Sequence, residues 1–174
     1  MPDTAYDEDA LRAAYGTFPV GSHTFDASHA KYEARADAKR RDALGGARVL
    51  VREPGPATAE DARLLFGYER EEDRWDVPGG GREPGETPEA TAHRELAEEV
   101  GIAVDLTGVV RAMRFRFTHA DRTVGGLWVY FVGVARSASL DVDGTELADA
   151  RWFDAPPADC DPHAVRAVET FRDG

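Results

Sequence analysis

Polar and apolar residues alternate, or apolar residues run together, along the second half of the chain, and this pattern predicts strands. Residues 113–118 read Met, Arg, Phe, Arg, Phe, Thr, which is the two-residue period of a strand with one face in water. Residues 127–134 are apolar on both faces, as in a central strand. We therefore expect an extended stretch over residues 103–118, broken near Thr107 and Gly108, and then a buried strand.

Further strands and helices complete an α/β pattern. Short strands are predicted over residues 47–52, 62–69, 75–81 and 150–153. The Pro and Gly residues at positions 54–56 favour a hairpin between the first two strands. Helices are predicted over residues 7–15, 30–44, 88–100 and 162–171. The fold class is therefore α/β, with helices packed on a mixed β-sheet.

The predicted helix over residues 88–100 has well-defined ends. Thr87 is a suitable N-cap, and Pro88 needs no hydrogen-bonded N–H at the first helical position. Gly101 suits the left-handed conformation just beyond a helix end. An inward-facing stripe consists of three apolar residues spaced four apart: Ala92, Leu96 and Val100.

Three glutamates share another face of this helix. Glu95, Glu98 and Glu99 stand at i, i+3 and i+4, within an arc of about 100°. Their charges repel one another, and Arg94, which reaches Glu98 at i+4, offsets only part of that repulsion. Such a cluster belongs either on a solvated acidic face or around a cation. Mg²⁺ and Mn²⁺ prefer carboxylate oxygens together with substrate phosphates.

The spacing of the residues around these acids distinguishes a solvated acidic face from a cation site. Nine positions match G-x5-E-x7-R-E-U-x-E-E-x-G-U, where U is aliphatic: Gly80, Glu86, Arg94, Glu95, Leu96, Glu98, Glu99, Gly101 and Ile102. The segment over residues 80–102 resembles the complete Nudix box, the signature of the Nudix hydrolases. A chance match at nine fixed positions is improbable, so the resemblance favours a cation site over a solvated helix face.

The resemblance implies the Nudix fold, an α/β/α sandwich with a mixed sheet in which the box forms a loop–helix–loop. It covers residues 47–171. We therefore expect two units, an N-terminal helical extension over residues 1–44 and a Nudix hydrolase domain over residues 45–174. The extension lies outside the resemblance. Three roles stay open for it: covering a sheet edge, contacting a second subunit in a homodimer, or shaping the substrate pocket.

The resemblance also implies a chemistry, the hydrolysis of a phosphoanhydride bond in a nucleoside diphosphate linked to another moiety. One to three Mg²⁺ or Mn²⁺ ions would bridge the phosphates and the glutamates, and would lower the pKa of an attacking water. Glu98 and Glu99 are the first choices as metal ligands, and Glu95 is the third. The Glu95 position can also supply the catalytic base. Arg94 is assigned to orienting these carboxylates.

Three other residues have assigned roles. Gly80 is expected to offer its backbone carbonyl to a metal and to allow a tight turn, while Glu86 braces the loop. Glu146 lies six residues before Trp152, an offset at which many Nudix proteins carry a metal ligand or a general base. A solvated loop acid is the alternative for Glu146, and Asp143 and Asp149 are weaker rivals for its role.

The residues that select the substrate are less determined. Four arginines are candidates to hold phosphate, against the alternative that they balance acids on solvated strand faces: Arg48, Arg52, Arg114 and Arg116. Four aromatic residues are candidates to stack on a base or ribose, although aromatics on central strands more often form the core: Phe115, Phe117, Trp128 and Tyr130.

The substrate class follows only by elimination. ADP-ribose-cleaving relatives carry a proline, and diadenosine-polyphosphate-cleaving relatives a tyrosine, where this chain has residues 117–120. These absences favour nucleoside triphosphates, oxidised ones included, with ADP-ribose or a nucleotide sugar as the alternative. A non-catalytic Nudix-fold nucleotide-binding regulator and an acidic metal-binding protein are competing functions, and the intact box argues against both.

Composition and charge limit the partners. The net charge is -12, and only two of the 21 basic residues are lysine. This balance resembles proteins of salt-accumulating halophiles, in which high salt screens the repulsion between acids. It argues against binding a nucleic-acid polymer. The chain has no apolar run near the roughly 18 residues of a membrane span, no signal-peptide core, and a single cysteine, Cys160. We therefore expect a soluble cytoplasmic protein without a membrane partner or an internal disulfide.

Overall fold

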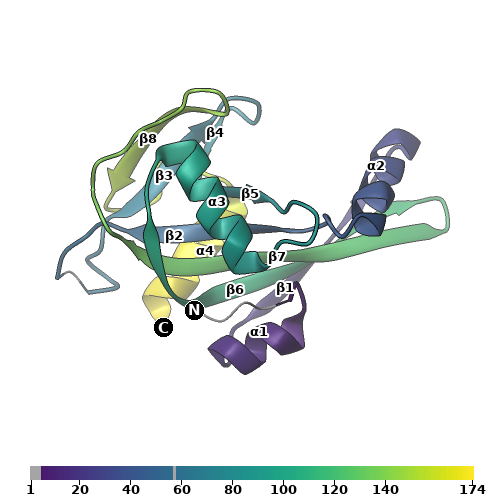
Figure 1. Cartoon of the computed structure of the whole chain (residues 1–174), viewed down its shortest axis with the longest axis horizontal. Helices are drawn as coiled ribbons and strands as arrows, with labels where there is room; N and C mark the ends of the chain where they lie inside the picture. Colours follow the sequence, from purple (N-terminus) through teal and green to yellow (C-terminus); the bar gives the residue numbers. More distant parts are fainter. Residues whose placement is uncertain (1–4, 57) are drawn as a thin grey trace.

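The computed structural model describes residues 5–56 and 58–174, which form one mixed β-sheet with helices on both faces (Figure 1). The strands of these residues are β1 Val20–Asp26, β2 Gly46–Arg52, β3 Leu64–Glu69, β4 Arg74–Asp76, β5 Gly79–Gly81, β6 Val104–His119, β7 Arg122–Ala135 and β8 Leu147–Phe153. Their helices are α1 Glu8–Tyr15, α2 His29–Arg40, α3 Pro88–Val100 and α4 Pro162–Asp173.

The sheet has the strand order β1-β6-β7-β2-β3-β4, with β5 also paired to β2 and β8 to β3. β1 is parallel to β6 and β2 is parallel to β7, whereas the other paired strands are antiparallel. In Figure 1, α3 lies in front of the sheet and α4 behind it, while the β6–β7 hairpin extends toward α2. This is the layered α/β/α arrangement that the sequence predicts.

Alternation along β2 divides the interior into two cores. Val49 and Val51 pack on the side of α3 and α1, whereas Leu50 packs on the side of α4. All three are fully buried. Because β2 lies near the middle of the sheet and has helices on both faces, its near-continuous apolar sequence is the expected one.

Helix α3 has the predicted bounds, and its caps are the predicted residues. The Thr87 side chain accepts a hydrogen bond from the backbone N–H of Ala90 at 3.2 Å, and Gly101 is left-handed with φ 66°. The apolar stripe is completely buried: Ala92, Leu96 and Val100. Its burial fixes the rotation of the helix and so fixes the directions of the glutamates on its other faces.

The segment before residue 44 contains the two helices that the sequence predicts and a strand that it does not. β1 pairs with residues 112–118 of β6 and forms an edge of the sheet. The β1 sequence, Val-Gly-Ser-His-Thr-Phe-Asp, has no clear period because an edge strand buries little, so only the pairing partner reveals it. Helix α2 ends at Arg40 rather than near residue 44, since Asp42 adopts a left-handed φ of 53°.

The other strands differ from the prediction at their ends. The predicted strand over residues 75–81 divides into β4 and β5, because Pro78 cannot donate to a ladder and Gly79 has a φ of 145°. The strand predicted over residues 150–153 begins at Leu147, and the one predicted over 127–134 begins at Arg122. In β6, the expected break near Thr107 is a register shift between Leu106 and Gly108.

No helix among the described residues is both long enough and apolar enough to cross a membrane.

We predict that Leu11→Ala lowers the free energy of unfolding by about 2–5 kcal/mol, because Leu11 of α1 is fully buried in the core beneath α3. Urea denaturation followed by circular dichroism measures the change. Ala13→Ser, on the exposed side of the same helix, is the control. An unchanged midpoint for Leu11→Ala would show that α1 does not stabilise the domain.

Candidate active site

Three carboxylates converge beside the N-terminal end of β8. Glu95 and Glu99 lie one turn apart on α3, and Glu146 immediately precedes β8. Their nearest carboxylate oxygens all lie within 4.8 Å of one another. Glu95 and Glu99 are each only 7% exposed, whereas Glu146 is exposed. Sequence reasoning left Glu146 open, and the structure places it with the two box acids.

The glycine strand β5 brings the backbone against the two buried acids. Gly79 donates its N–H to Glu99 at 3.0 Å. A Cβ on Gly79 would lie 2.2 Å from the Ala47 carbonyl oxygen, and one on Gly80 would lie 2.6 Å from the Glu95 carboxylate. Side chains at these positions would therefore separate β5 from β2 or from α3, which explains why both positions are glycine.

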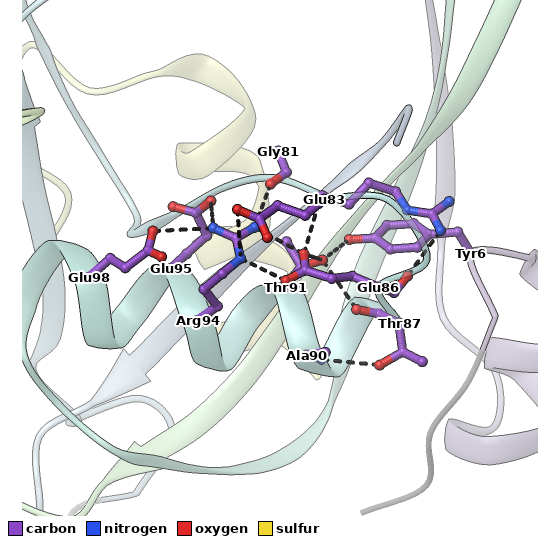
Figure 2. A network of polar contacts seen from close by, with 11 residues as sticks. Tyr6, Gly81, Glu83, Glu86, Thr87, Ala90, Thr91, Arg94, Glu95 and Glu98 are labelled. Carbon is purple, nitrogen blue, oxygen red and sulfur yellow. Dashed lines mark hydrogen bonds and ion pairs between the residues drawn. The ribbon is translucent and has the colours of Figure 1, made fainter. Parts of the chain in front are cut away.

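Arg94 occupies the centre of the network drawn in Figure 2. Its guanidinium forms a two-pronged contact with Glu86, with N–O distances of 2.6 and 2.9 Å. It also donates to Glu95 at 2.8 Å, to Glu98 at 3.2 Å and to the Gly81 carbonyl at 2.9 Å. Arg94 thus connects the loop before α3 to the helix face that carries the acids. These contacts are compatible with a role in orienting metal ligands, and that role stays a prediction.

Glu86 braces the loop that precedes α3. Besides Arg94, it accepts hydrogen bonds from the backbone N–H of Glu83 and from the Thr91 hydroxyl, each at 2.9 Å. The Arg94 hydrogen bonds, followed by the other two, lower the pKa of Glu86 to about 2. The carboxylate is therefore ionised and fully occupied by protein donors.

The N-terminal extension reaches the same network. The Tyr6 hydroxyl donates to Thr91 at 2.8 Å, and Thr91 in turn donates to Glu86 (Figure 2). Arg82 lies over the Tyr6 ring at 4.2 Å and forms a 3.0 Å ion pair with Asp42. Residues from before position 45 therefore stabilise the loop on which the candidate site is built.

The acids of the site have perturbed pKa values. Burial raises the pKa of Glu99 to about 8, and the Gly79 hydrogen bond opposes that shift. Burial also raises the pKa of Glu95, against the hydrogen bond from Arg94. Burial therefore makes the ionised form of each side chain less stable in the protein than in water. A cation among them would stabilise the ionised forms, and carboxylate oxygens suit hard divalent ions such as Mg²⁺ and Mn²⁺.

Glu98, a first choice from the sequence, lies apart from this trio. Its side chain is 59% exposed and pairs with Arg94 at 3.2 Å. It faces a small cavity of about 140 Å³ that Glu99, Asp143 and Glu146 also line. Glu98 is thus at the rim of the acidic cluster, and its role as a ligand stays a prediction.

A cleft of about 500 Å³ opens beside the three carboxylates. Acids, glycines and one aromatic residue form most of its lining: Glu69, Glu71, Glu72, Gly79, Gly80, Gly81, Glu99, Trp128 and Glu146. Arg48 also lines it, but its guanidinium is held by Glu69 at 2.9 Å, Asp76 at 3.1 Å and the Val77 carbonyl at 2.9 Å. Arg48 therefore braces the cleft wall in this structure.

The other three candidate arginines do not line the cleft, as far as the structure describes the chain. Arg52 lies four residues beyond Arg48 at the other end of β2, about 13 Å along the strand. Arg114 forms an ion pair with Glu8 of α1. Arg116 is exposed two positions further along β6. Their roles in binding substrate stay predictions without support from this geometry.

Glu69 and Asp76 are site residues that sequence reasoning did not identify. They come from β3 and β4, and they meet only because Arg48 of β2 lies between them. Burial raises the pKa of Asp76 to about 7, although Arg48 opposes the shift. In the sequence they resemble the solvated acids of the turn at residues 69–76, so no local signal distinguishes them.

Residues 49–173 match the family described as the NUDIX domain, and the chain therefore belongs to the Nudix family. The chain is 35% identical over 80 residues to an RNA pyrophosphohydrolase of Erythrobacter litoralis, covering 42% of this chain and 49% of the relative. It is 36% identical over 86 residues to the nucleoside triphosphatase NudI of an Enterobacter species, covering 45% and 60%. The chain spans about half the length of the first curated relatives that it matches.

Solved structures confirm the fold. A NUDIX hydrolase from Nitrosomonas europaea aligns with a TM-score of 0.53 at 23% identity, covering 75% of this chain and 88% of that protein. The dihydroneopterin triphosphate pyrophosphohydrolase of E. coli aligns with a TM-score of 0.52 at 23% identity, covering 73% and 94%. At this identity the likeness shows the Nudix fold alone, and the expected α/β/α sandwich is confirmed.

We predict that the Mn²⁺ affinity rises with pH between 6 and 8. Near pH 6 the affinity should change by roughly tenfold for each pH unit, because one proton competes with the ion. The reason is that a cation binds ionised Glu99, whose pKa of about 8 lets protons compete below that pH. Electron paramagnetic resonance of free Mn²⁺ measures the affinity. Glu99→Gln should flatten the slope, and equal affinity at pH 6 and pH 8 in the unchanged protein would contradict the assignment.

We predict that Arg94→Lys weakens Mn²⁺ binding roughly 10- to 100-fold, the usual cost of losing a group that orients a metal ligand. A lysine ammonium cannot make the planar fork to Glu86 while also reaching Glu95 and Gly81. Calorimetric titration measures the loss. Arg136→Lys, at an exposed ion pair with Asp105, should bind Mn²⁺ like the unchanged protein. Equal Mn²⁺ affinities for the two variants would show that Arg94 does not contribute to metal binding.

Proposed function

We propose that this protein is a divalent-metal-dependent pyrophosphohydrolase that cleaves a phosphoanhydride bond in a nucleoside diphosphate linked to another group. Nucleoside triphosphates, oxidised ones included, are the favoured substrates. The observation that carries the proposal is the convergence of Glu95, Glu99 and Glu146 within 4.8 Å at the edge of a cleft of about 500 Å³. The nucleoside triphosphatase among the relatives supports the substrate class.

In this proposal, Glu95, Glu99 and Glu146 hold the first Mg²⁺ or Mn²⁺ ion, and Glu98 contributes to a further ion at the rim. The metal supplies charge neutralisation for the phosphates and lowers the pKa of bound water. The Gly80 carbonyl stays a ligand candidate from the sequence; the Gly80 α-carbon faces the Glu95 carboxylate, while its carbonyl oxygen lies close to Gly46 of β2. Without a cation, the polyphosphate and the cleft acids would repel one another.

The general base is proposed from the same set of acids. Glu146 is the exposed member of the trio, and its position before β8 is fixed by a 3.0 Å hydrogen bond from the Arg70 N–H to its backbone carbonyl. Glu95 is the alternative base, but Arg94 already binds one of its oxygens. Arg94 acts as a positioning residue in either case, since it contacts the acids rather than the cleft.

The charge distribution supports a small nucleotide as the partner. The cleft lining contains five glutamates and one arginine that is already paired. A nucleic-acid polymer would place many phosphates on a protein of net charge -12 without counterions from basic side chains. We further propose that the protein works in a salt-rich cytoplasm, where screening offsets this charge.

We predict that the purified protein releases phosphate or pyrophosphate from nucleoside triphosphates only when Mg²⁺ or Mn²⁺ is present, and that Glu99→Gln lowers kcat/KM roughly 100-fold or more. Glu60→Gln, an exposed glutamate outside the cleft, is the matched control. Assays at low and high salt, with ADP-ribose and a nucleotide sugar in the panel, test the substrate class and the salt requirement together.

Two outcomes would contradict the proposal. Nucleotide binding without turnover of any substrate would favour the non-catalytic regulator instead. Turnover that Glu99→Gln and Glu60→Gln leave equally unchanged would place the chemistry away from the carboxylate trio.

A further inference from the structure

A second groove, of about 340 Å³, lies beside the acidic cleft. Gly81 and Trp128 line both cavities, so the groove and the cleft are neighbours that share part of their walls. Apolar and aromatic side chains form most of the second lining: Phe25, Leu44, Met113, Phe115, Phe117 and Trp128. The volume lies within the range of roughly 300–1,000 Å³ that is typical of small-molecule sites.

The N-terminal extension builds one wall of this groove. Phe25, the second-last residue of β1, stacks on Phe117, with ring centroids 5.2 Å apart. Arg35 of α2 lies over the Phe117 ring at 5.1 Å, and Ala43 and Leu44 complete the wall. These residues precede the part of the chain that matches the NUDIX domain, which begins at residue 49. The groove therefore belongs to this chain rather than to the matched domain alone.

The opposite wall is a rigid part of the sheet. Met113, Phe115 and Phe117 alternate along β6 and so share one of its faces, and each is less than 8% exposed because they pack together with Leu44 in a small hydrophobic cluster. A Cβ on Gly126 of β7 would lie 2.8 Å from the Phe115 ring. The absence of a side chain at Gly126 leaves room for the Phe115 ring, so this wall is already packed in the protein without a ligand.

The two cavities differ in chemistry. The cleft beside the carboxylates is acidic, whereas the groove is mostly apolar. Two arginines also line the groove: Arg35 of α2, and Arg82, which forms an ion pair with Asp42. A molecule that fits both must carry a metal-binding phosphate chain at one end and a flat apolar group at the other. Nucleotides have this composition, and bases bind on aromatic side chains through their π-faces.

We propose that the groove between the N-terminal extension and β6 binds the base of the nucleotide substrate, so that the extension makes the enzyme select nucleotides over base-free polyphosphates. This inference rests on the proposed function, because it places the phosphate chain in the acidic cleft. It gives residues 25–44 a role in specificity, in addition to their packing.

Filling the groove tests this role without removing any core side chain. Ala43 is half-buried and lines the groove from a loop, so Ala43→Phe places a ring in it and Ala43→Leu fills it less. Ala34→Phe, on the exposed surface of α2, is the matched control. For each variant, kcat/KM is measured with a nucleoside triphosphate and with inorganic tripolyphosphate in the presence of Mg²⁺, and thermal unfolding verifies the fold.

The expected result for Ala43→Phe is a loss of roughly tenfold or more in kcat/KM for the nucleotide, through a higher KM. Its activity on tripolyphosphate should stay within about twofold of the unchanged protein, as should both activities of Ala34→Phe. The kcat/KM of Ala43→Leu for the nucleotide should lie between the values of Ala43→Phe and of the unchanged protein. Equal losses on both substrates, or no loss on the nucleotide, would overturn the proposal.

Two further measurements separate this inference from the proposed function. If the unchanged protein hydrolyses neither substrate, the proposed function fails, and calorimetric titration with a non-hydrolysable nucleoside triphosphate analogue still tests the groove. Weaker binding by Ala43→Phe than by Ala34→Phe would support the base site, and equal binding would refute it.

A second copy of the chain is the other possible occupant of the groove. Sedimentation measures the oligomeric state of both variants. A change of oligomeric state in Ala43→Phe alone would assign the groove to a second copy and overturn the proposal.

Discussion

The fork between Arg94 and Glu86 is the interaction on which the candidate site depends. The Arg94 side chain is 21% exposed, and its guanidinium donates hydrogen bonds to four groups at the same time: Glu86, Glu95, Glu98 and the Gly81 carbonyl. It neutralises part of the charge on α3 and attaches the preceding loop to the helix. If it were lost, the acids would face one another without a counter-charge in a partly buried place, where repulsion is strong.

The glycines of β5 and the burial of α3 determine what those acids can do. The Gly79 and Gly80 backbone lies close to Glu95 and Glu99. Burial raises the pKa of both carboxyl groups, although the Gly79 hydrogen bond opposes the shift for Glu99 and Arg94 opposes it for Glu95. The protein therefore holds carboxylates in a state that a divalent cation would stabilise. The same arrangement costs stability in the absence of a cation, a common feature of functional sites.

The N-terminal extension is part of the fold as well as part of the site. Leu11 enters the main core, β1 extends the sheet, and Tyr6 continues the hydrogen-bond chain from Thr91 and Glu86 toward Arg94. Of the three roles open for it from the sequence, the structure shows directly that it covers the β6 edge. The separation of the chain into two units at residue 44 stays a prediction, because the extension packs against the remainder.

The sequence by itself determined α3, its caps and the acids that the helix presents, because a helix with a defined start, stop and apolar stripe fixes the direction of each of its side chains. It also determined the family, through nine residues at fixed spacing. Only the tertiary structure decided that Glu146 joins Glu95 and Glu99 while Glu98 stays at the rim. It also decided that Arg48 is held between Glu69 and Asp76, and that β1 lies on β6. These contacts join residues far apart in the chain, and their energies come from burial and pairing in the folded sheet, which leave no local pattern in the sequence.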